Sequence, residues 1–231
     1  MSANPVYVAL DTPDLDRALA LAAQVAPYVG GLKLGKEFLA ANGPEALSRF
    51  HAFGLPVFAD TKFHDIPNTV AGAVRATVRL GVHIVNVHAS GGAAMMQAAR
   101  DAAKEVDPSI RVIAVTVLTS MSDADLLAVG QATPARDQVL RLADLAQACG
   151  LDGVVCSAHE IAPIRAAQGK DFLLVVPGIR PEGAALGDQQ RVMGPKAALD
   201  AGASILVIGR PITGAQDPAD AARAIAESLG Y

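Results

Sequence analysis

The 231-residue chain has no tryptophan, only two cysteines and five scattered histidines. The cysteines, Cys149 and Cys156, form no CxxC motif, and the histidines form no HxxxH pair, so the sequence contains no zinc-binding pattern. Apolar stretches such as VIAVTVL are far shorter than a membrane-spanning helix, and the first residues, MSANPVYVALD, lack the basic and apolar regions of a secretory signal. We therefore expect a cytoplasmic protein whose cysteines are small buried side chains.

Charge is also sparse. Only 18% of the residues are charged, the net charge is -4 and 52% are hydrophobic. This composition indicates a large apolar core and excludes the basic surface of a nucleic-acid-binding protein. The length fits one domain, so we expect a single catalytic domain over residues 1–231, with no nucleic-acid or membrane partner.

Eight short runs rich in Val, Ile and Leu are separated by segments with helical periodicity. The runs predict strands at 6–11, 31–35, 56–62, 84–89, 111–119, 153–157, 172–178 and 205–210. The segments between them include helices expected at 14–26, 44–54, 69–81, 91–106, 137–150 and 218–230.

A glycine ends four of the helical segments, immediately before the next strand. These glycines are Gly54, Gly81, Gly150 and Gly202, where a left-handed residue commonly terminates a helix. Alternating apolar strands and helices favour a parallel sheet covered by helices, and about 29 residues per unit favour a single (β/α)8 TIM barrel. An open doubly wound sheet is the alternative, but the first strand-to-helix turn, DTPDLD, has no GxGxxG sequence.

Polar side chains recur where the expected strands end, and the active site of a barrel enzyme lies at the carboxyl ends of its strands. For Asn86, His88 and Ser157, the return of polarity at a strand end is as good an explanation as function. In chain order, the polar and glycine residues at these ends are Asp11, Lys33, Asp60, Lys62, Asn86, His88, Thr119, Ser120, Ser157, Gly178, Arg180, Gly209 and Arg210.

The strongest cluster involves two lysines. Lys33 lies between apolar neighbours in GLKLG. Burying its charge has a large free-energy cost unless carboxylates neutralise it. Asp60 and Lys62 are two residues apart on one strand, so their side chains should leave the same face, next to Lys33. With Asp11, this set is suited to electrostatic stabilisation and proton donation. Asp65 follows after the strand has turned, so geometry leaves its direction open.

A second cluster is suited to binding phosphate. The connection PGIRPEGAALGDQQ follows the seventh strand and IGRPITG follows the eighth, where barrels often bind a phosphoryl group. Backbone N–H groups at Gly209 and Arg210, near a helix start, can face the anion while the guanidinium pairs with its oxygens. Arg180 and Gln189 flank a segment that we expect to act as a lid.

The segment DTKFHDIPNT resembles the DxKxxDIPxT signature of the orotidine 5'-monophosphate decarboxylase family. The motifs VNVHASGG, VLTSM, CSA, PGIRP, GDQ and IGRPIT follow in the order of that family, and the likeness runs from Val8 to about Pro218, closest to the bacterial short-chain branch. DxKxxD alone is less specific, because sister phosphosugar barrels also carry it. The resemblance implies a cofactor-free and metal-free decarboxylase that performs the last step of de novo pyrimidine nucleotide synthesis.

The resemblance also implies a role for each matched residue. Lys62 would donate a proton to C6 of the pyrimidine, and Asp65 and Thr69 would reach the site from the other subunit of a homodimer. The implied catalytic residues are Lys62, Asp60, Lys33 and Asp65. Three of the implied substrate-binding residues would contact the ribose: Asp11, Lys33 and Thr69. Thr119 and Ser120 would lie near the pyrimidine, and the phosphate would be bound by Arg180, Gln189, Gly209 and Arg210.

Two other functions remain open. The first is a magnesium-dependent 3-keto-gulonate 6-phosphate decarboxylase, which would use the same DxKxxD strand. Lys33 argues against it, because a hard divalent cation binds oxygen ligands and the resemblance suggests an acidic residue at this position in those enzymes. The second is a non-catalytic nucleotide-binding barrel, against which the intact set of Lys33, Asp60, Lys62 and Asp65 argues.

Overall fold

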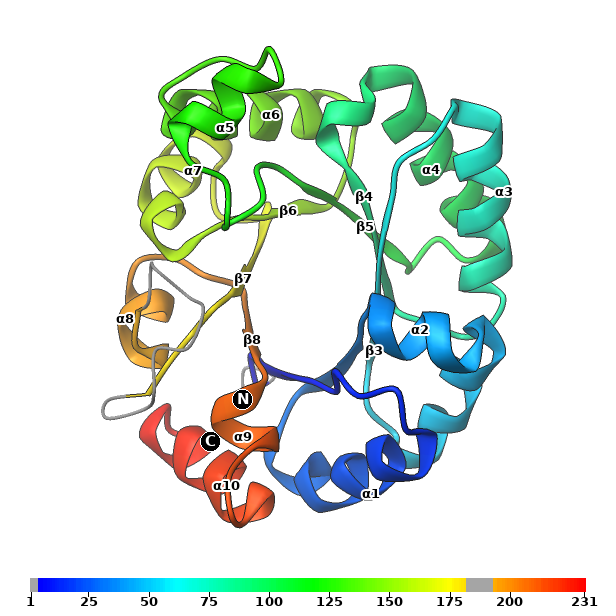
Figure 1. Cartoon of the computed structure of the whole chain (residues 1–231), viewed down its shortest axis with the longest axis vertical. Helices are drawn as coiled ribbons and strands as arrows, with labels where there is room; N and C mark the ends of the chain where they lie inside the picture. The colour runs from blue at the N-terminus through cyan, green and yellow to red at the C-terminus, as the bar shows by residue number, and fades with distance from the viewer. Residues whose placement is uncertain (1–3, 182–192) are drawn as a thin grey trace.

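The computed structural model of the chain describes residues 4–181 and 193–231. Within these residues, eight parallel strands close into a barrel in chain order, with the last strand paired to the first (Figure 1). The strands are β1 (Val6–Ala9), β2 (Gly31–Leu34), β3 (Val57–Phe63), β4 (Ile84–His88), β5 (Arg111–Val115), β6 (Gly153–Val155), β7 (Leu173–Pro177) and β8 (Ile205–Ile208). The predicted (β/α)8 barrel is therefore confirmed, and the open sheet is excluded.

Helices surround the closed sheet on its outside (Figure 1). The α-helices described are α1 (Leu15–Val25), α2 (Lys36–Asn42), α3 (Pro67–Val78), α4 (Ala93–Val106), α5 (Asp123–Ala128), α6 (Ala135–Ala148), α7 (Ile161–Gln168), α8 (Pro195–Asp200), α9 (Arg210–Thr213) and α10 (Pro218–Ser228). The 3-10 helices are η1 (Ala26–Tyr28), η2 (Pro44–Phe53), η3 (Ala89–Gly91) and η4 (Ala158–Glu160). The segment expected as a helix at 44–54 is thus a 3-10 helix. No helix in the described ranges has the length and apolarity needed to cross a bilayer.

The four helix-ending glycines adopt the left-handed conformation that the sequence predicted. Their φ angles are 66° at Gly54, 77° at Gly81, 73° at Gly150 and 109° at Gly202. In this region a side chain is strained and glycine is not, which explains why each of these connections turns directly into a strand.

Two apolar layers hold the barrel together, because each strand is buried on both faces. Between the sheet and the helices lies a large cluster that includes both cysteines, which are free thiols. Inside the barrel lies a smaller cluster formed by Tyr7, Ala9, Phe58, Ile84, Ile113, Val175 and Val207. The burial predicted for Cys149 and Cys156 is confirmed, and the inner cluster forms the floor below the carboxyl ends of the strands.

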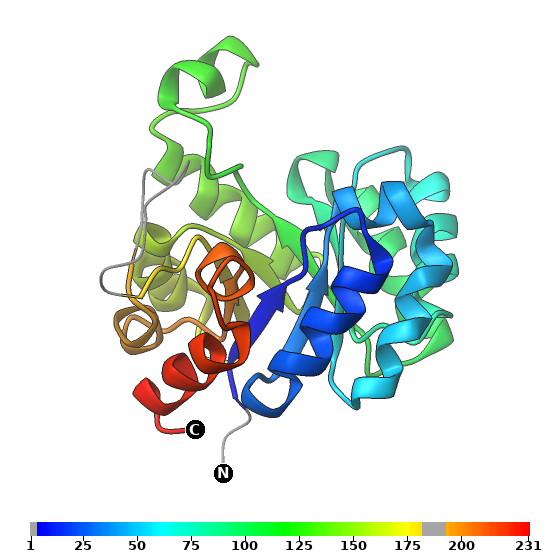
Figure 2. The ribbon, with the colours of Figure 1, turned by 60° about the horizontal axis from the view of Figure 1, so that its bottom comes forward.

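The predicted end of the fifth strand is wrong. β5 was expected to run to residue 119, but it ends at Val115. Its neighbours stop at the same level, because His88 is the last residue of β4 and Val155 the last of β6. Thr116 still donates its backbone N–H to the backbone oxygen of Val155, but the residues after it have no strand to pair with. They leave the barrel and lead to α5, which projects beyond it (Figure 2).

Candidate active site

A cavity of about 490 Å³ opens where the carboxyl ends of the strands meet. Its walls come from β1, β2 and β3 on one side and from β6, β7 and β8 on the other. Two of its polar positions lie two residues beyond members of the inner apolar cluster. Asp11 follows Ala9 and Asp60 follows Phe58 in this way. Since side chains alternate along a strand, the inward-facing row changes from apolar to polar at the mouth.

Lys33 lies between two carboxylates. Its Nζ is 2.8 Å from Oδ1 of Asp11 and 3.3 Å from Oδ2 of Asp60, and the residue is only 6% exposed. The register of the sheet produces this arrangement, because Lys33 pairs with Ala9 of β1 and with Phe58 of β3, just below the two acids. The predicted neutralisation of Lys33 by carboxylates is confirmed.

Gly35 leaves space for the ion pair between Lys33 and Asp11. A Cβ at this position would lie 2.7 Å from Oδ1 of Asp11 and 3.0 Å from Nζ of Lys33. A larger residue would therefore push the two charged groups apart, and the glycine that ends GLKLG contributes to the site through its lack of a side chain.

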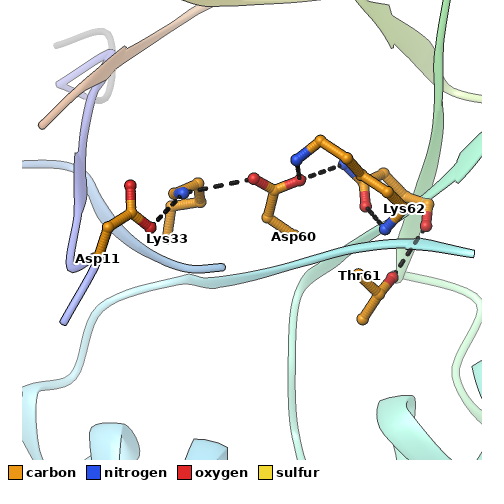
Figure 3. Close-up of polar contacts among 6 residues, drawn as sticks. Asp11, Lys33, Asp60, Thr61 and Lys62 are labelled. Atoms are coloured by element: carbon orange, nitrogen blue, oxygen red, sulfur yellow. Dashed lines mark hydrogen bonds and ion pairs between the residues drawn. The ribbon is translucent and has the colours of Figure 1, made fainter. Parts of the chain in front are cut away.

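Lys62 continues the row of charges from an irregular stretch of backbone. Its Nζ is 2.5 Å from Oδ1 of Asp60, so Asp60 accepts from both lysines (Figure 3). The side chains meet as expected, but regular alternation does not explain the contact. Lys62 has a φ of 50°, and the pairing of β3 with β4 shifts register between Ala59 and Phe63. A bulge therefore sets the direction of Lys62.

The charges in this row balance. Asp11, Lys33, Asp60 and Lys62 alternate in sign and supply two carboxylates and two ammonium groups (Figure 3). Burial raises the pKa of Asp60, but the positive charges of Lys33 and Lys62 and the hydrogen bonds from Lys62 and Asn86 outweigh it, so the pKa lies below its usual value. Asp60 is therefore ionised at neutral pH and stabilises the positive charge of both lysines.

Asn86 belongs to the site, although its place at a strand end favours a structural explanation as much as a functional one. Its side-chain N–H donates to Oδ1 of Asp60 at 2.7 Å, and its side-chain oxygen accepts from the backbone N–H of Lys62, also at 2.7 Å. The residue is fully buried. The signal that could have identified it is an asparagine inside the apolar run IVNVH, because a buried amide needs polar partners.

His88 lies at the end of the same strand, with its ring centroid 5.7 Å from that of His64. Burial, and then the positive charges of His64, Lys36 and Lys62, lower the pKa of His88 to about 4. His88 is therefore neutral at neutral pH and is a poor candidate for a proton donor in that range.

The opposite wall of the cavity carries the predicted phosphate-binding residues. Arg180 follows β7 and is buried, whereas Arg210 begins α9 directly after β8 and is exposed. Gly209 precedes Arg210 and also lines the cavity. Gln189, the fourth of these residues, lies outside the described residues. The cavity therefore has positively charged groups on two opposite walls.

Four other predicted residues do not line this cavity. Asp65 and Thr69 are exposed on the segment after β3, and Oδ1 of Asp65 accepts from the backbone N–H of Ile66 at 2.7 Å. Thr119 and Ser120 lie in the loop after β5, four and five residues beyond its last residue, Val115. Their placement at the end of that strand was wrong because β5 is shorter than expected.

A second hollow, of about 600 Å³, lies outside the barrel between α2, η2 and α3. Its lining is mostly apolar and includes Leu39, Phe63 and Leu80. It contains none of the row of charged residues, so the chemistry belongs to the smaller cavity at the mouth. Among the described residues, no group of three or more His, Cys, Asp or Glu side chains is placed to hold a metal ion.

The chain is similar to one family of known proteins over almost its whole length. Residues 4–225 match the model of the Orotidine 5'-phosphate decarboxylase / HUMPS family. The chain is 54% identical over 226 residues to the orotidine 5'-phosphate decarboxylase of Novosphingobium aromaticivorans, covering 98% of this chain and 99% of that protein. It is 55% identical over 238 residues to the protein of the same name from Rhodospirillum rubrum, covering 100% and 96%. The crystal structure of orotidine 5'-phosphate decarboxylase from Lactobacillus acidophilus has a TM-score of 0.87 to this structure at 35% identity, covering 99% and 100%.

Proposed function

The chain belongs to the orotidine 5'-phosphate decarboxylase / HUMPS family and decarboxylates orotidine 5'-monophosphate to uridine 5'-monophosphate in pyrimidine biosynthesis, and we propose that Lys62 protonates the carbon that loses CO2. The family description joins two names, so the choice between them rests on the relatives, which are named orotidine 5'-phosphate decarboxylase. The observation that carries the role of Lys62 is the row of alternating charges at the mouth of the barrel, in which Lys33 and Asp60 are buried.

The reaction requires a fixed positive charge at one carbon. Breaking the bond from C6 to the carboxylate leaves the electron pair on C6, in an orbital that lies in the plane of the ring. The π system of the ring cannot delocalise this pair directly. An ammonium group held beside C6 stabilises the developing charge and then transfers its proton to C6. The neutral amine that remains on Lys62 regains its proton from solvent before the next turnover.

Asp60 has two roles in this proposal. Its contact with Lys62 directs the ammonium group at one place. Its ionised carboxylate also lies on the side of the cavity where the carboxylate of the substrate must fit. The repulsion between the two anions is relieved when CO2 leaves, which favours the decarboxylated state over the bound substrate.

The other walls hold the parts of the substrate that do not react. We assign the ribose to Asp11 and Lys33 and the phosphate to Arg180, Gln189, Gly209 and Arg210. We assign the pyrimidine to Thr119 and Ser120, which lie in the loop after β5 and not in the cavity wall. Binding energy from the phosphate organises the site around C6, because contacts remote from the reacting atoms contribute to the rate through the orientation of the substrate. No cofactor or metal ion takes part in this scheme.

The proposed enzyme works as a homodimer in which Asp65 and Thr69 serve the site of the partner. Three observations support this arrangement. Both side chains are exposed and absent from the lining of their own cavity. Ile66 between them is 67% exposed and adds an apolar side chain to the same surface. The apolar hollow between α2 and α3 adds further apolar surface, which a second copy could cover.

We also propose that the protein acts in the cytoplasm. Cys149 and Cys156 are buried free thiols, and burial raises the pKa of each. Thiols in this state are typical of a reducing compartment.

A direct assay tests the function. Purified protein is incubated with orotidine 5'-monophosphate, and the loss of orotidylate ultraviolet absorbance is followed together with the release of CO2. We expect both to proceed in a one-to-one ratio with uridine 5'-monophosphate. Tight binding of the substrate without any absorbance change would instead identify a non-catalytic nucleotide-binding barrel.

A further inference from the structure

Asn86 connects the two strands that carry the reacting charges. It lies in β4, opposite the bulge of β3, and is fully buried. Its side chain reaches Asp60 and the backbone of Lys62, each at 2.7 Å, while its backbone oxygen accepts from the hydroxyl group of Thr61 at 2.9 Å. One residue of β4 therefore contacts three consecutive residues of β3.

The backbone of Lys62 needs such a partner. Lys62 is the one non-glycine residue with a positive φ in the described part of the chain. Side chains other than glycine are strained in this conformation, which persists only where the surroundings impose it. At the bulge, the N–H of Lys62 bonds to the side chain of Asn86. The amide oxygen of Asn86 satisfies this donor and holds the strained residue in place.

The chemistry at this position requires an amide. A backbone N–H can only donate and an ionised carboxylate can only accept, so the partner between them needs an acceptor and a donor in one small group. The amide of asparagine has both. Leucine would offer neither, and ionised aspartate would accept from Lys62 but repel Asp60.

We propose that Asn86 is a positioning residue of the decarboxylation site, which sets the place of the Lys62 ammonium group by holding both the backbone of Lys62 and the carboxylate of Asp60. The proposal rests on the proposed role of Lys62 as proton donor. Oδ1 of Asp60 accepts from both Asn86 and Nζ of Lys62, so the amide keeps this oxygen on the side of Lys62, while Oδ2 faces Lys33. Without the amide, Asp60 keeps its contacts with the two lysines but loses the donor that orients Oδ1, and the backbone of Lys62 loses its hydrogen bond, so the proton donor is displaced from C6.

The first test separates catalysis from binding. In Asn86→Ala we expect kcat to fall by about 10²-fold, because a misplacement of about 1 Å has an effect of this size. KM should stay within about threefold of the wild type, because this change leaves the phosphate and ribose contacts intact. The control is Thr77→Val, which removes a buried hydroxyl group of α3 bonded only to its own helix. We expect normal kcat from this variant.

The second test uses pH and a variant of nearly the same shape. In Asn86→Asp, the new carboxylate faces Asp60, which also contacts Lys62 and Lys33. The residue of β5 that pairs with position 86 is the apolar Ile113 and carries no charge. Two carboxylates this close share a proton, so one pKa is strongly raised. The shared proton restores a donor to Asp60. We therefore expect kcat relative to the wild type to rise at least about tenfold as the pH falls from 8 to 5.5. His88, with a pKa of about 4, stays neutral over this range.

A third measurement does not depend on turnover. In a crystal structure of Asn86→Ala, we expect Lys62 to leave its φ of 50° and Nζ to move away from Asp60. Normal kcat and an unchanged Lys62 would overturn the proposal, as would a loss of activity in Asn86→Asp that is the same at every pH. A wild-type protein that does not decarboxylate the substrate would refute the proposed function alone, since the Lys62 geometry still tests the role of Asn86.

Discussion

Nζ of Lys62 lies 2.5 Å from Oδ1 of Asp60, across a bulge in β3 where Lys62 adopts a φ of 50°. Regular strand alternation would also place these side chains on one face, but here the bulge sets their geometry. The conformation is strained and is retained at the centre of a charged cavity. Strain of this kind is typical of a functional site.

Removing the ammonium group should abolish most of the activity. We expect Lys62→Ala to lower kcat for orotidine 5'-monophosphate by at least about 10³-fold, because it removes both the proton donor and the charge that stabilises the carbanion. The melting temperature and circular dichroism should stay close to those of the wild type. The control, Lys170→Ala, removes an exposed lysine and should leave kcat unchanged. Equal rates for Lys62→Ala and the wild type would refute the mechanism.

Asp60 should make the stability of the protein depend on pH. Its pKa is lower in the folded chain than in the unfolded chain, so its contribution to stability is fully present above the unfolded value of about 3.9 and is lost as the pH falls through the folded value. We expect Asp60→Asn to lower the free energy of unfolding by about 3 kcal/mol near neutral pH, because it leaves the buried Lys33 and the partly buried Lys62 without their shared partner.

The difference between Asp60→Asn and the wild type should shrink below about pH 4. Urea unfolding between pH 3 and 7 measures it. Asp171→Asn, which changes an exposed carboxylate, is the control and should show little difference at any pH. If the loss of unfolding free energy in Asp60→Asn were constant across this pH range, it would contradict the lowered pKa of Asp60.

Arg210 should contribute through the phosphate group. We expect Arg210→Ala to lower kcat/KM for orotidine 5'-monophosphate by roughly 10²- to 10³-fold, the loss typical of removing one partner of a charged hydrogen-bonded pair. With orotidine, which has no phosphate, the variant and the wild type should react equally slowly. Arg223→Ala, which removes a guanidinium group paired with Asp220 on its own helix, should behave as the wild type. Near-normal efficiency of Arg210→Ala on the phosphorylated substrate would refute this role.

Mixing two inactive variants tests the shared site. If Asp65 serves the partner subunit, a hybrid of Asp65→Ala and Lys62→Ala has one site with both defects and one intact site. After random exchange of subunits, about a quarter of all sites should be intact, because a two-fold dimer pairs each site with one partner loop. Activity is measured before and after the two proteins are unfolded and refolded together. If no activity returns although the dimer forms, Asp65 acts within its own subunit.

Chelation separates the two decarboxylases of related architecture. We expect full activity after prolonged incubation with EDTA, because the ammonium group of Lys33 already occupies the position between Asp11 and Asp60. A divalent cation there would compete with that ammonium group. A loss of activity that magnesium restores, together with turnover of 3-keto-gulonate 6-phosphate, would favour the metal-dependent alternative.

The positions of the strands and helices could be predicted because local patterns specify them. Each strand is buried on both faces and therefore appears in the sequence as a continuous apolar run. Gly54 and Gly81 marked helix ends, because few residues other than glycine adopt a left-handed conformation cheaply. The pairing of Lys33 with carboxylates could also be predicted, since a buried lysine needs an opposite charge.

The length of β5 could not be predicted in the same way. Its apolar run continues beyond Val115, but a strand extends only as far as its neighbours do, and the neighbours come from other parts of the chain. The misplacement of Thr119 and Ser120 follows from this limit. For the same reason, the sequence left the direction of Asp65 open.

The sequence by itself thus determined the barrel, the row of charges at its mouth and the family to which the chain belongs, because each depends on residue type and spacing along the chain. Only the tertiary structure decided how Lys62 is held. Its positive φ, the break in register between β3 and β4, and the two hydrogen bonds of Asn86 depend on one another. An asparagine in an apolar strand acquires this role only when the closing barrel brings it against the residue whose backbone it supports.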